Sequence, residues 1–533
     1  MRFFGAKESH ILVSRGLTVS GEPLSKELEM KMPGYGWLIA ALGIALCSVG
    51  CGSGASAAPA QTHLAATNHP LVAQYSISEY GPAGIWAEFG PDTNYGRETS
   101  VIATTELKTN SVTLQVAGMK ASSTYHMRVH VDYANGASWV GQDETFTTGA
   151  LPSTNHLGLT VTRPNPNLGV TQDGVEMLDL ITAPGTNNLE GVVTDLDGNI
   201  IWYYDPGVFP FPIKQLSNGH VLYTAGTDMQ EVDLAGNIIR HMTLDSLNQK
   251  LQAAGFTITP TGLHHDILVL PNGHWIVLGQ MSKTYTNLPG YPGDTDVLGD
   301  VLIDLDPDWN PVWTWSSFEH LDVNRHMFGL PDWTHSNAVI YTPNDGNIIV
   351  SMRNQSWLLK IDYADGAGTG AVLWRLGIDG DFAISPNDPA QWFYGQHYPN
   401  LIGTDGSQVT LAIFDDGDLR PDSGGIGCPV TGPYPACYSR AVIVQADEAV
   451  KVATVQWQYL PQYYTLWGGS IGILDNGDVE FDGSQPFGST IGSRILEVTQ
   501  TDNPQVVWQM DTSGASAYRG FRIPSLYPGV VWH

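Results

Sequence analysis

Asn272-Gly273-His274-Trp275-Ile276 is the stretch that decides the fold, because its pattern returns at intervals along the chain. An Asn-Gly or Asp-Gly pair followed by apolar residues predicts a tight β-hairpin, and we expect type I′ turns with positive φ at both central positions. The five copies of the pair are Asn218-Gly219, Asn272-Gly273, Asp345-Gly346, Asp405-Gly406 and Asn476-Gly477. Each copy predicts two neighbouring strands of one sheet.

A second motif alternates with the hairpins and consists of a turn followed by apolar residues and usually Trp. Its six copies end at Trp202, Arg240, Trp313, Trp374, Trp457 and Trp508. Two motifs that alternate in this order predict six units of roughly four strands each. The interpretation is a six-bladed β-propeller over residues 160–533.

The composition agrees with an all-β protein and excludes one class of partner. Lys and Arg number 24 against 53 Asp and Glu, which gives a net charge of −29. Such a chain lacks the basic surface that nucleic-acid binding requires. Only 14% of the 533 residues are charged, while 59 are Gly and 33 are Pro, which favours many short strands over long helices.

A smaller unit precedes the repeat. Residues 52–68 are rich in Gly, Ser, Ala, Pro and Thr and predict a flexible linker. Residues 69–150 contain runs with period-two alternation, such as Tyr125–Val131, and predict a small β-sandwich. The segment resembles a fibronectin type III module, in which Tyr125 would be the corner tyrosine.

The first 51 residues predict an export signal. The apolar run Trp37–Leu46 follows Lys31 and is about half the length of a membrane-spanning helix, so a cleaved signal is expected. Met30 or Met32 would be a more ordinary start than Met1, so residues 1–29 are interpreted as a misassigned extension.

Two cleavage sites remain open after this signal. Gly50-Cys51 predicts a bacterial lipoprotein whose Cys51 is lipidated, whereas Ala55-Ser56-Ala57 would release a soluble periplasmic protein. The expected location is the periplasm or cell surface, with a lipid anchor in a bacterial membrane. In that oxidising compartment Cys428 and Cys437 predict a local disulfide.

Three histidines occupy equivalent places in the repeat. His265, His335 and His397 lie seven, ten and eight residues before the hairpin pairs of three consecutive units. Each is therefore predicted to sit just ahead of the first hairpin strand of its unit. In a propeller that strand lines the central channel, so the three imidazoles should meet at one end of it.

Arg353 and Asn337 should join the histidines. Arg353 follows a hairpin, and antiparallel pairing returns it to the level of His335. Asn337 lies two residues after His335 and so shares its face of the strand. His264 adjoins His265, and because only one of two adjacent strand residues can face the channel, we favour His265 and expect Asp266 to face away.

Other interpretations of these residues stay open. Three His with an open position would suit zinc, but Arg353 would repel a cation, so we expect no metal and no cofactor. A metal-dependent lyase or hydrolase is nevertheless one alternative, and a non-catalytic surface-anchored propeller that binds a glycan or protein is another. Asp415-Asp416-Gly417-Asp418 predicts a solvated turn, with a calcium loop as its alternative.

At these residues the sequence resembles the bacterial arylsulfate sulfotransferase family. The matching segments are His264-His265-Asp266-Ile267, Asp332-Trp333-Thr334-His335-Ser336-Asn337, Ser351-Met352-Arg353-Asn354-Gln355-Ser356, Gly395-Gln396-His397-Tyr398-Pro399-Asn400 and Tyr518-Arg519-Gly520-Phe521-Arg522-Ile523. The resemblance implies a six-bladed propeller that moves a sulfuryl group from a phenolic sulfate ester to a phenol by a ping-pong route, without a nucleotide donor.

The resemblance also implies roles for residues. His397 corresponds to the histidine that is transiently sulfated, and His265, His335, Asn337 and Arg353 correspond to other active-site positions. Cys428 and Cys437 resemble a short disulfide near the family's site. The N-terminal module and the lipid anchor depart from the family, which leaves oligomeric state and acceptor range open.

Overall fold

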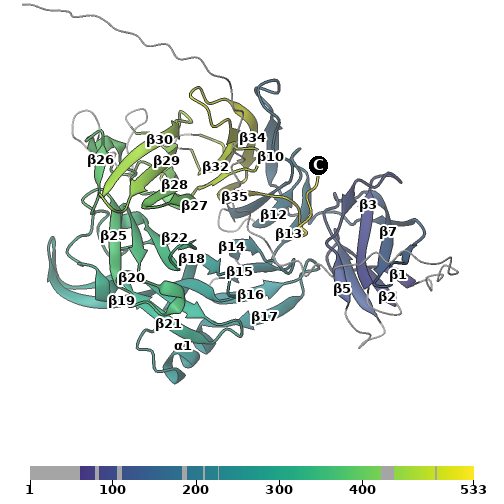
Figure 1. Cartoon of the computed structure of the whole chain (residues 1–533), viewed down its shortest axis with the longest axis horizontal. Coiled ribbons are helices and arrows are strands. Elements are labelled where there is room, and N and C mark those ends of the chain that lie inside the picture. The colour runs from purple at the N-terminus through teal and green to yellow at the C-terminus, as the bar shows by residue number, and fades with distance from the viewer. Residues whose placement is uncertain are drawn as a thin grey trace, which may run out of the picture. The chain divides into compact units, whose positions relative to one another are not determined.

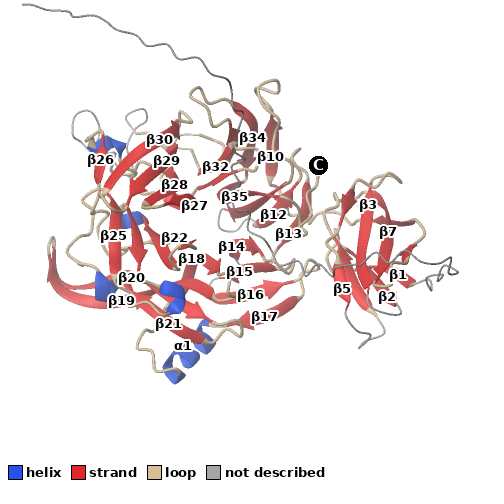
Figure 2. Ribbon diagram, viewed as in Figure 1, coloured by secondary structure: helices blue, strands red, loops and turns tan. Residues whose placement is uncertain are grey.

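The computed structural model describes residues 60–78, 83–104, 111–182, 189–207, 210–225, 227–421, 437–486 and 489–533. Strands dominate these residues, so the predicted all-β class is confirmed (Figure 2). Within these ranges no helix is long and apolar enough to cross a bilayer. The predictions for residues 1–51, including Cys51, and for Cys428 fall outside the described residues.

The N-terminal unit is built from two antiparallel sheets (Figure 1). The first holds β1 (Gln61–Ala66), β2 (Ala73–Ser78) and β6 (Val112–Val116). The second holds β3 (Ala83–Gly90), β4 (Arg97–Glu98), β5 (Ile102–Thr104), β7 (Thr124–Tyr133), β8 (Ser138–Val140) and β9 (Glu144–Thr147). Alternate side chains of β2 and β7 are buried, as the period-two pattern predicts.

The predicted linker is wrong at its C-terminal end. Gln61–Ala66, inside the range 52–68, pairs in register with β2. Its small and polar side chains hid it from a search for apolar alternation, because β1 is an edge strand with no fully buried position. Backbone pairing with β2 and the packing of Leu64 against the core hold this segment as a strand.

Residues from 158 onward form six antiparallel sheets of four principal strands. The first joins β35 (Ala515–Ile523), β11 (Val175–Thr182), β12 (Gly191–Thr194) and β13 (Ile200–Tyr204); the second, β14 (Pro210–Gln215), β15 (Val221–Ala225), β16 (Asp228–Val232) and β17 (Ile238–Met242). The third joins β18 (Gly262–Val269), β19 (Trp275–Leu288), β20 (Tyr291–Leu305) and β21 (Pro311–Ser316); the fourth, β22 (Ser336–Thr342), β23 (Asn347–Met352), β24 (Trp357–Ile361) and β25 (Val372–Gly377).

The last two sheets each carry a fifth strand at the edge. One joins β27 (His397–Asp405), β28 (Gln408–Asp415), β29 (Arg440–Asp447) and β30 (Val452–Tyr459), with β26 (Ala383–Ser385) parallel to β30. The other joins β31 (Ser470–Ile473), β32 (Val479–Ser484), β33 (Ser493–Val498) and β34 (Val506–Ser513), with β10 (Gly158–Thr162) beside β34. Short helices α1 (Leu244–Ala253), α2 (Ser317–His320), η1 (Arg353–Gln355), η2 (Ala364–Gly366) and η3 (Pro389–Gln391) connect strands.

The first strands of the sheets are neighbours in space. β14 contacts β18, β18 contacts β22, β22 contacts β27, β27 contacts β31, and β31 contacts β35. β35 pairs with β11, which in turn contacts β14, so the contacts return to their starting sheet. Figure 1 labels β14, β18, β22, β27 and β35 among them and shows these five near the middle of the larger group of sheets. Side chains at the starts of these strands are therefore brought together.

Both sequence motifs have a fixed place in the sheets. Each Asn-Gly or Asp-Gly pair connects the first and second strand of a sheet, and each copy of the Trp motif forms the fourth strand. The sheet of β35, β11, β12 and β13 has no such hairpin because its first strand, β35, comes from the C-terminal region and cannot be joined to β11 by a turn. Closure of the ring thus explains why five hairpins accompany six Trp-motif strands.

The predicted turn type is wrong. At the first hairpin Gly219 has a φ of 84°, but Asn218 does not have a positive φ. Gly219 N–H donates to Leu216 O, and Leu216 N–H donates to His220 O, which is a three-residue connection with the glycine in the left-handed region. Asn218 Oδ1 accepts from His220 N–H at 3.0 Å, so the Asn acts through its side chain.

Candidate active site

The structure brings the three predicted histidines together. His265 lies in β18, His335 immediately precedes β22, and His397 begins β27. The rings of His265 and His335 have centroids 4.6 Å apart. His265 and His397 each lie 5.6 Å from the ring of Tyr518, which stands between them. Three consecutive sheets and β35 thus contribute to one cluster.

Irregular backbone at the start of the strands positions these side chains. His265 has a φ of 58° and His335 a φ of 47°, a conformation that costs a non-glycine residue about 1–2 kcal/mol. The pairing of β18 with β19 shifts between Leu263 and Ile267, so the residues between them form a bulge. Strained residues of this kind cluster at functional sites, where the surrounding packing holds them.

The bulge gives the two adjacent histidines, His264 and His265, different contacts. His265 contacts His335 and Tyr518, whereas His264 Nε2 lies 3.1 Å from Asp300 Oδ1. The two Nδ1 atoms are 2.7 Å apart, so one ring donates to the other. His264 therefore lies behind His265 and links it to a buried carboxylate.

The prediction that Asp266 faces away from the cluster is wrong. Because the bulge breaks the alternation of side chains, Asp266 is buried and forms ion pairs with Lys214, at 2.5 Å, and Arg519, at 3.5 Å. Burial alone would raise the pKa of Asp266, but Lys214 and Arg519 lower it below its usual value. Asp266 thus anchors two cations beside the histidines.

His397 is the most deeply buried of the three histidines, with 1% of its surface exposed. Its Nδ1 makes a short hydrogen bond to Asp416 Oδ2, and its Nε2 accepts from Gly468 N–H at 3.2 Å. Since a backbone N–H only donates, Nε2 carries the lone pair and Nδ1 carries the proton. The carboxylate of Asp416 therefore fixes the tautomer that leaves Nε2 nucleophilic.

Burial and nearby cations keep two of the imidazoles neutral. Burial, followed by the charge of Arg353, lowers the pKa of His397 well below its usual value. Burial and then His335 do the same for the pKa of His265. Both rings are therefore uncharged at neutral pH, and a neutral imidazole is a nucleophile.

Arg353 lies where the hairpin pairing places it. Its backbone N–H donates to His335 O at 3.2 Å. Its Nη2 donates to Asp418 Oδ2 at 2.6 Å and to Leu466 O at 2.7 Å, while Nη1 donates to Asn354 Oδ1 at 2.8 Å. Arg353 Nε has no hydrogen-bond partner among the described residues. The guanidinium is held firmly yet retains donors for a ligand.

Asn337 is buried at a second bulge, where the pairing of β22 with β23 shifts between Ser336 and Ala338. Its Nδ2 donates to Gln396 O at 2.7 Å, which turns the side chain toward β27. Its Oδ1 has no partner within the described part of the chain. Asn337 therefore offers an acceptor beside His397.

Sequence reasoning missed the contribution of β35. The hydroxyl of Tyr518 and Nε of Arg519 are buried without a partner in the described ranges, and Arg519 Nη2 donates to Asn337 O. Burial raises the pKa of Tyr518, so its hydroxyl keeps its proton and can donate. Both residues lie in a segment quoted above for its resemblance, but they lie far in sequence from the hairpins, and repeat spacing assigns them no place.

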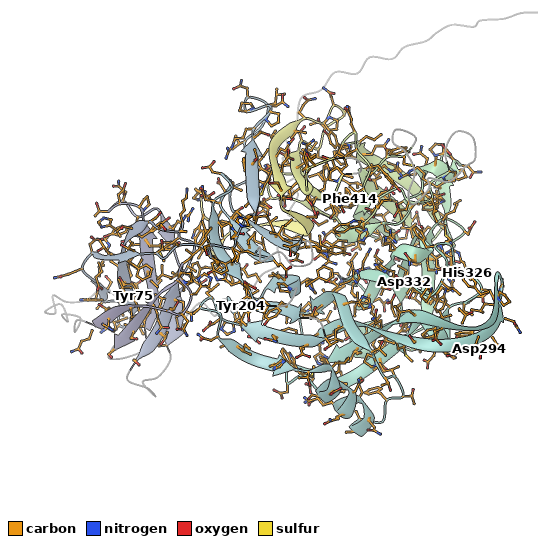
Figure 3. All side chains as sticks on the ribbon, turned by 180° about the vertical axis from the view of Figure 1, so that it is seen from behind. Tyr75, Tyr204, Asp294, His326, Asp332 and Phe414 are labelled. Carbon is orange, nitrogen blue, oxygen red and sulfur yellow. The ribbon has the colours of Figure 1, made fainter. Side chains whose placement is uncertain are left out.

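The predicted solvated turn at Asp415–Asp418 is also wrong. All three carboxylates are buried: Asp415 pairs with Arg420 and Arg440, while Asp416 and Asp418 hold His397 and Arg353. Another acid, Asp332, holds His335, with 2.6 Å between its Oδ2 and His335 Nδ1 (Figure 3 labels Asp332). The sequence signal that could have revealed these pairs was the run of acidic residues itself, because a buried cluster of His and Arg needs carboxylate partners.

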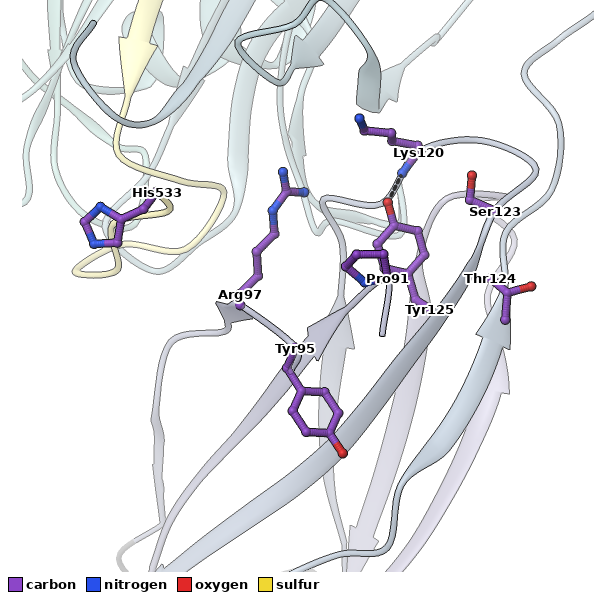
Figure 4. A pocket seen from close by; sticks show the side chains of 9 residues that line it. Pro91, Tyr95, Arg97, Lys120, Ser123, Thr124, Tyr125 and His533 are labelled. Carbon is purple, nitrogen blue, oxygen red and sulfur yellow. Dashed lines mark hydrogen bonds between the residues drawn. The ribbon is translucent and has the colours of Figure 1, made fainter. Parts of the chain in front are cut away.

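The pockets described on the surface do not include the cluster. One has a volume of 380 Å³ and is lined by Arg97, Lys120, Tyr125, His533 and their neighbours, as Figure 4 shows. Another, of 480 Å³, shares Lys120 and Ser123 with it. Among the described residues, no group of three or more His, Cys, Asp and Glu has the arrangement to hold a metal ion.

The fold and cluster define a class of protein: an all-β scaffold in which a neutral imidazole, buried arginines and hydrogen-bonding atoms without a partner among the described residues lie in one cluster. The sequence profile of the family described as Arylsulfotransferase (ASST) matches residues 165–519, about two thirds of the chain. This chain belongs to that family, and the predicted resemblance is confirmed. Membership implies a sulfotransferase with a sulfate donor and an acceptor.

Comparison with other proteins adds little. No curated protein matches the chain. Among solved structures, a crystal structure of an ACO/RPE65 chimera matches with 12% sequence identity, over 86% of this chain and 94% of that chain, at a TM-score of 0.26. A score this low does not establish a shared fold.

Proposed function

We propose that this protein moves a sulfuryl group from a phenolic sulfate ester to a phenol through a sulfohistidine on His397, without a nucleotide donor. The observation that carries the proposal is the environment of His397. Its Nδ1–H is bound by Asp416, its pKa is lowered by burial, and Arg353 lies among the charges that act on it. Family membership supports sulfuryl transfer in general.

In the first half-reaction the Nε2 lone pair of His397 attacks sulfur, and the bond from sulfur to the aryl oxygen breaks. The departing phenolate takes a proton from the imidazolium form of His335, which Asp332 holds in place, and the His335 ring is left neutral. In the second half-reaction the acceptor phenol returns its proton to His335 while its oxygen attacks sulfur. The bond between Nε2 and sulfur then breaks, and its electron pair returns to Nε2.

Charge on the sulfuryl oxygens is the main barrier that the site must lower, because such transfers pass through a loose, in-line transition state. Arg353 Nε is buried without a hydrogen-bond partner among the described residues, so it can donate to a sulfuryl oxygen. Arg519, whose guanidinium carbon lies 5.5 Å from the ring centroid of Tyr518, adds positive charge to the same region.

The remaining expectations complete the proposal. The six sheets are interpreted as the blades of one propeller, because their first strands contact in a closed order. The sandwich is interpreted as a fibronectin type III module, since Tyr125 Oη accepts from Lys120 N–H at 3.0 Å, as a corner tyrosine does. The Cys428–Cys437 disulfide, the lipid on Cys51 and export to the periplasm or cell surface remain predictions.

A donor–acceptor screen tests the function. The purified chain is mixed with a chromogenic aryl sulfate, with and without a phenol, and release of the chromophore is followed. Phenol-dependent turnover that persists after treatment with a metal chelator supports the proposal. A folded protein that releases no chromophore refutes the proposal in favour of the binding alternative. A protein that loses its turnover when the chelator removes bound zinc refutes it in favour of the metal-enzyme alternative.

A further inference from the structure

Six consecutive residues between β30 and β31 contact the site, although no sequence motif marks them. Tyr464 Oη donates to Asp418 at 2.6 Å and Thr465 Oγ1 donates to Asp416 at 2.9 Å. Leu466 O accepts from Arg353, and the ring of Trp467 stacks on Tyr518 with 6.3 Å between centroids. Gly468 and Gly469 complete the segment, which we call the 464–469 segment.

The backbone of Gly468 touches the nucleophile itself. Its N–H donates to His397 Nε2 at 3.2 Å, which is the atom that attacks sulfur in the proposed reaction. The next amide, Gly469 N–H, donates to Tyr518 O at 2.8 Å and holds the adjacent peptide, between Gly468 and Gly469. In the structure, the Gly468 amide therefore occupies the lone pair that the reaction uses.

Only glycine fits at this position. Gly468 has a φ of 71°, and a Cβ built there would lie 2.2 Å from Ser484 Oγ and 3.3 Å from Tyr518 Cδ2. A larger residue would be strained and would displace either the amide or its neighbours. The close approach of this peptide to His397 thus depends on the missing side chain.

Formation of the sulfohistidine changes what the amide can bind. Once Nε2 is bonded to sulfur, it has no lone pair and no longer accepts a hydrogen bond. The buried N–H would then lack a partner, which costs about 1–3 kcal/mol. The sulfuryl oxygens, attached to the same Nε2 through sulfur, are the acceptors closest to the donor in that state.

We propose that the Gly468 amide is a catalytic hydrogen-bond donor that caps His397 Nε2 at rest and transfers its hydrogen bond to a sulfuryl oxygen as the bond from Nε2 to sulfur forms. The inference rests on the proposed function, because it requires His397 to carry the sulfuryl group. No proton leaves the amide: only the acceptor changes, from the Nε2 lone pair to an oxygen of the transferred group.

Gly468→Ala tests the position of the amide. We expect the rate of the phenol burst, measured with an aryl sulfate and no acceptor, to fall by about 10- to 100-fold, since loss of one such donor costs an enzyme up to about 10³-fold. The KM for the donor should change much less, because the amide does not meet the sulfuryl oxygens before bond formation. A merely structural role would instead lower the melting temperature and raise KM.

A second substitution provides the matched control. Gly468→Ala with Ser484→Gly removes the colliding Oγ and should recover at least fivefold of the lost burst rate, whereas Ser484→Gly alone should remain near wild type. If Gly468→Ala does not fold, a backbone ester at position 468, introduced with glycolic acid, removes the N–H without adding atoms. The ester should show the same loss of burst rate.

The outcomes separate this inference from the proposed function. If wild type releases no phenol, the proposed function fails and the inference with it. If wild type shows a burst and both the folded Gly468→Ala variant and the ester variant match it, the proposed function stands and the role of the Gly468 amide is refuted.

Discussion

Replacing Asp416 with Asn tests the pairing that prepares His397 for attack. The side chain of Asp416 is fully buried, and its Oδ2 accepts the Nδ1–H of His397 while Oδ1 accepts from Thr465. Burial, followed by the charge of Asp418, raises the pKa of Asp416 well above its usual value, although Arg353 and Thr465 act in the opposite direction. Asp416→Asn keeps the shape but removes the carboxyl group, which is the group that can ionise beside His397. In the proposed reaction the imidazole gains positive character as Nε2 bonds to sulfur. That charge favours the ionised form of Asp416, so the carboxylate stabilises the transition state more than the resting enzyme.

The expected magnitude follows from the kind of hydrogen bond that is lost. A hydrogen bond to a charged group contributes about 1.5–3 kcal/mol. At about 1.4 kcal/mol for each factor of ten, sulfurylation of His397 should slow by about 10- to 150-fold. An Asn side chain that rotates its amide N–H toward Nδ1 would select the wrong tautomer and increase the loss.

The assay is a stopped-flow burst of chromophore from an aryl sulfate, without acceptor. The matched control is Asp228→Asn, which removes a carboxylate 2.9 Å from a histidine, His241, at a partly exposed pair away from the cluster. It should leave the burst unchanged. A folded Asp416→Asn variant with a wild-type burst rate would refute the role assigned to the carboxylate.

Four further predictions follow from the site, the fold and the N-terminus. His397→Asn should abolish both the burst and the sulfuryl adduct seen by peptide mass spectrometry, and initial rates of wild type should give parallel ping-pong lines; intersecting lines would indicate direct transfer. Arg353→Lys should lower activity by more than tenfold, a loss above about 1.4 kcal/mol, because a single ammonium cannot replace the planar fork, and near-normal activity would show that Arg353 acts only as a distant charge. Burial raises the pKa of Asp179 from 3.8 to about 7, so the folded protein binds a proton that the unfolded chain releases. The free energy of unfolding should therefore fall as pH rises from about 4 to 7. Asp179→Asn should flatten this dependence of the unfolding free energy on pH, measured by urea titration, and an unchanged dependence would contradict the assignment. Cys51→Ser should release the protein from the membrane fraction, whereas a mature N-terminus at Ala58 in wild type would exclude the lipoprotein.

Local pattern determined much of this protein. The hairpin pairs and the Trp motif place the first and fourth strands of the sheets, because turn chemistry and side-chain alternation act over a few residues. The same repeat locates His265, His335 and His397 at equivalent ends of neighbouring strands, which the structure brings together. Arg353 beside His335 follows from antiparallel pairing alone.

Tertiary structure decided what surrounds those residues. β35 brings Tyr518 and Arg519 from the end of the chain to β11, a pairing that no local pattern encodes. The bulge in β18 makes Asp266 an ion-pair partner of Arg519. Folding buries Asp416 against His397, although the acidic composition of its turn predicts exposure to solvent. The 464–469 segment reaches the nucleophile only because the sheets converge. These contacts join residues distant in sequence, and their energies depend on burial and on partners that exist only once the sheets have assembled.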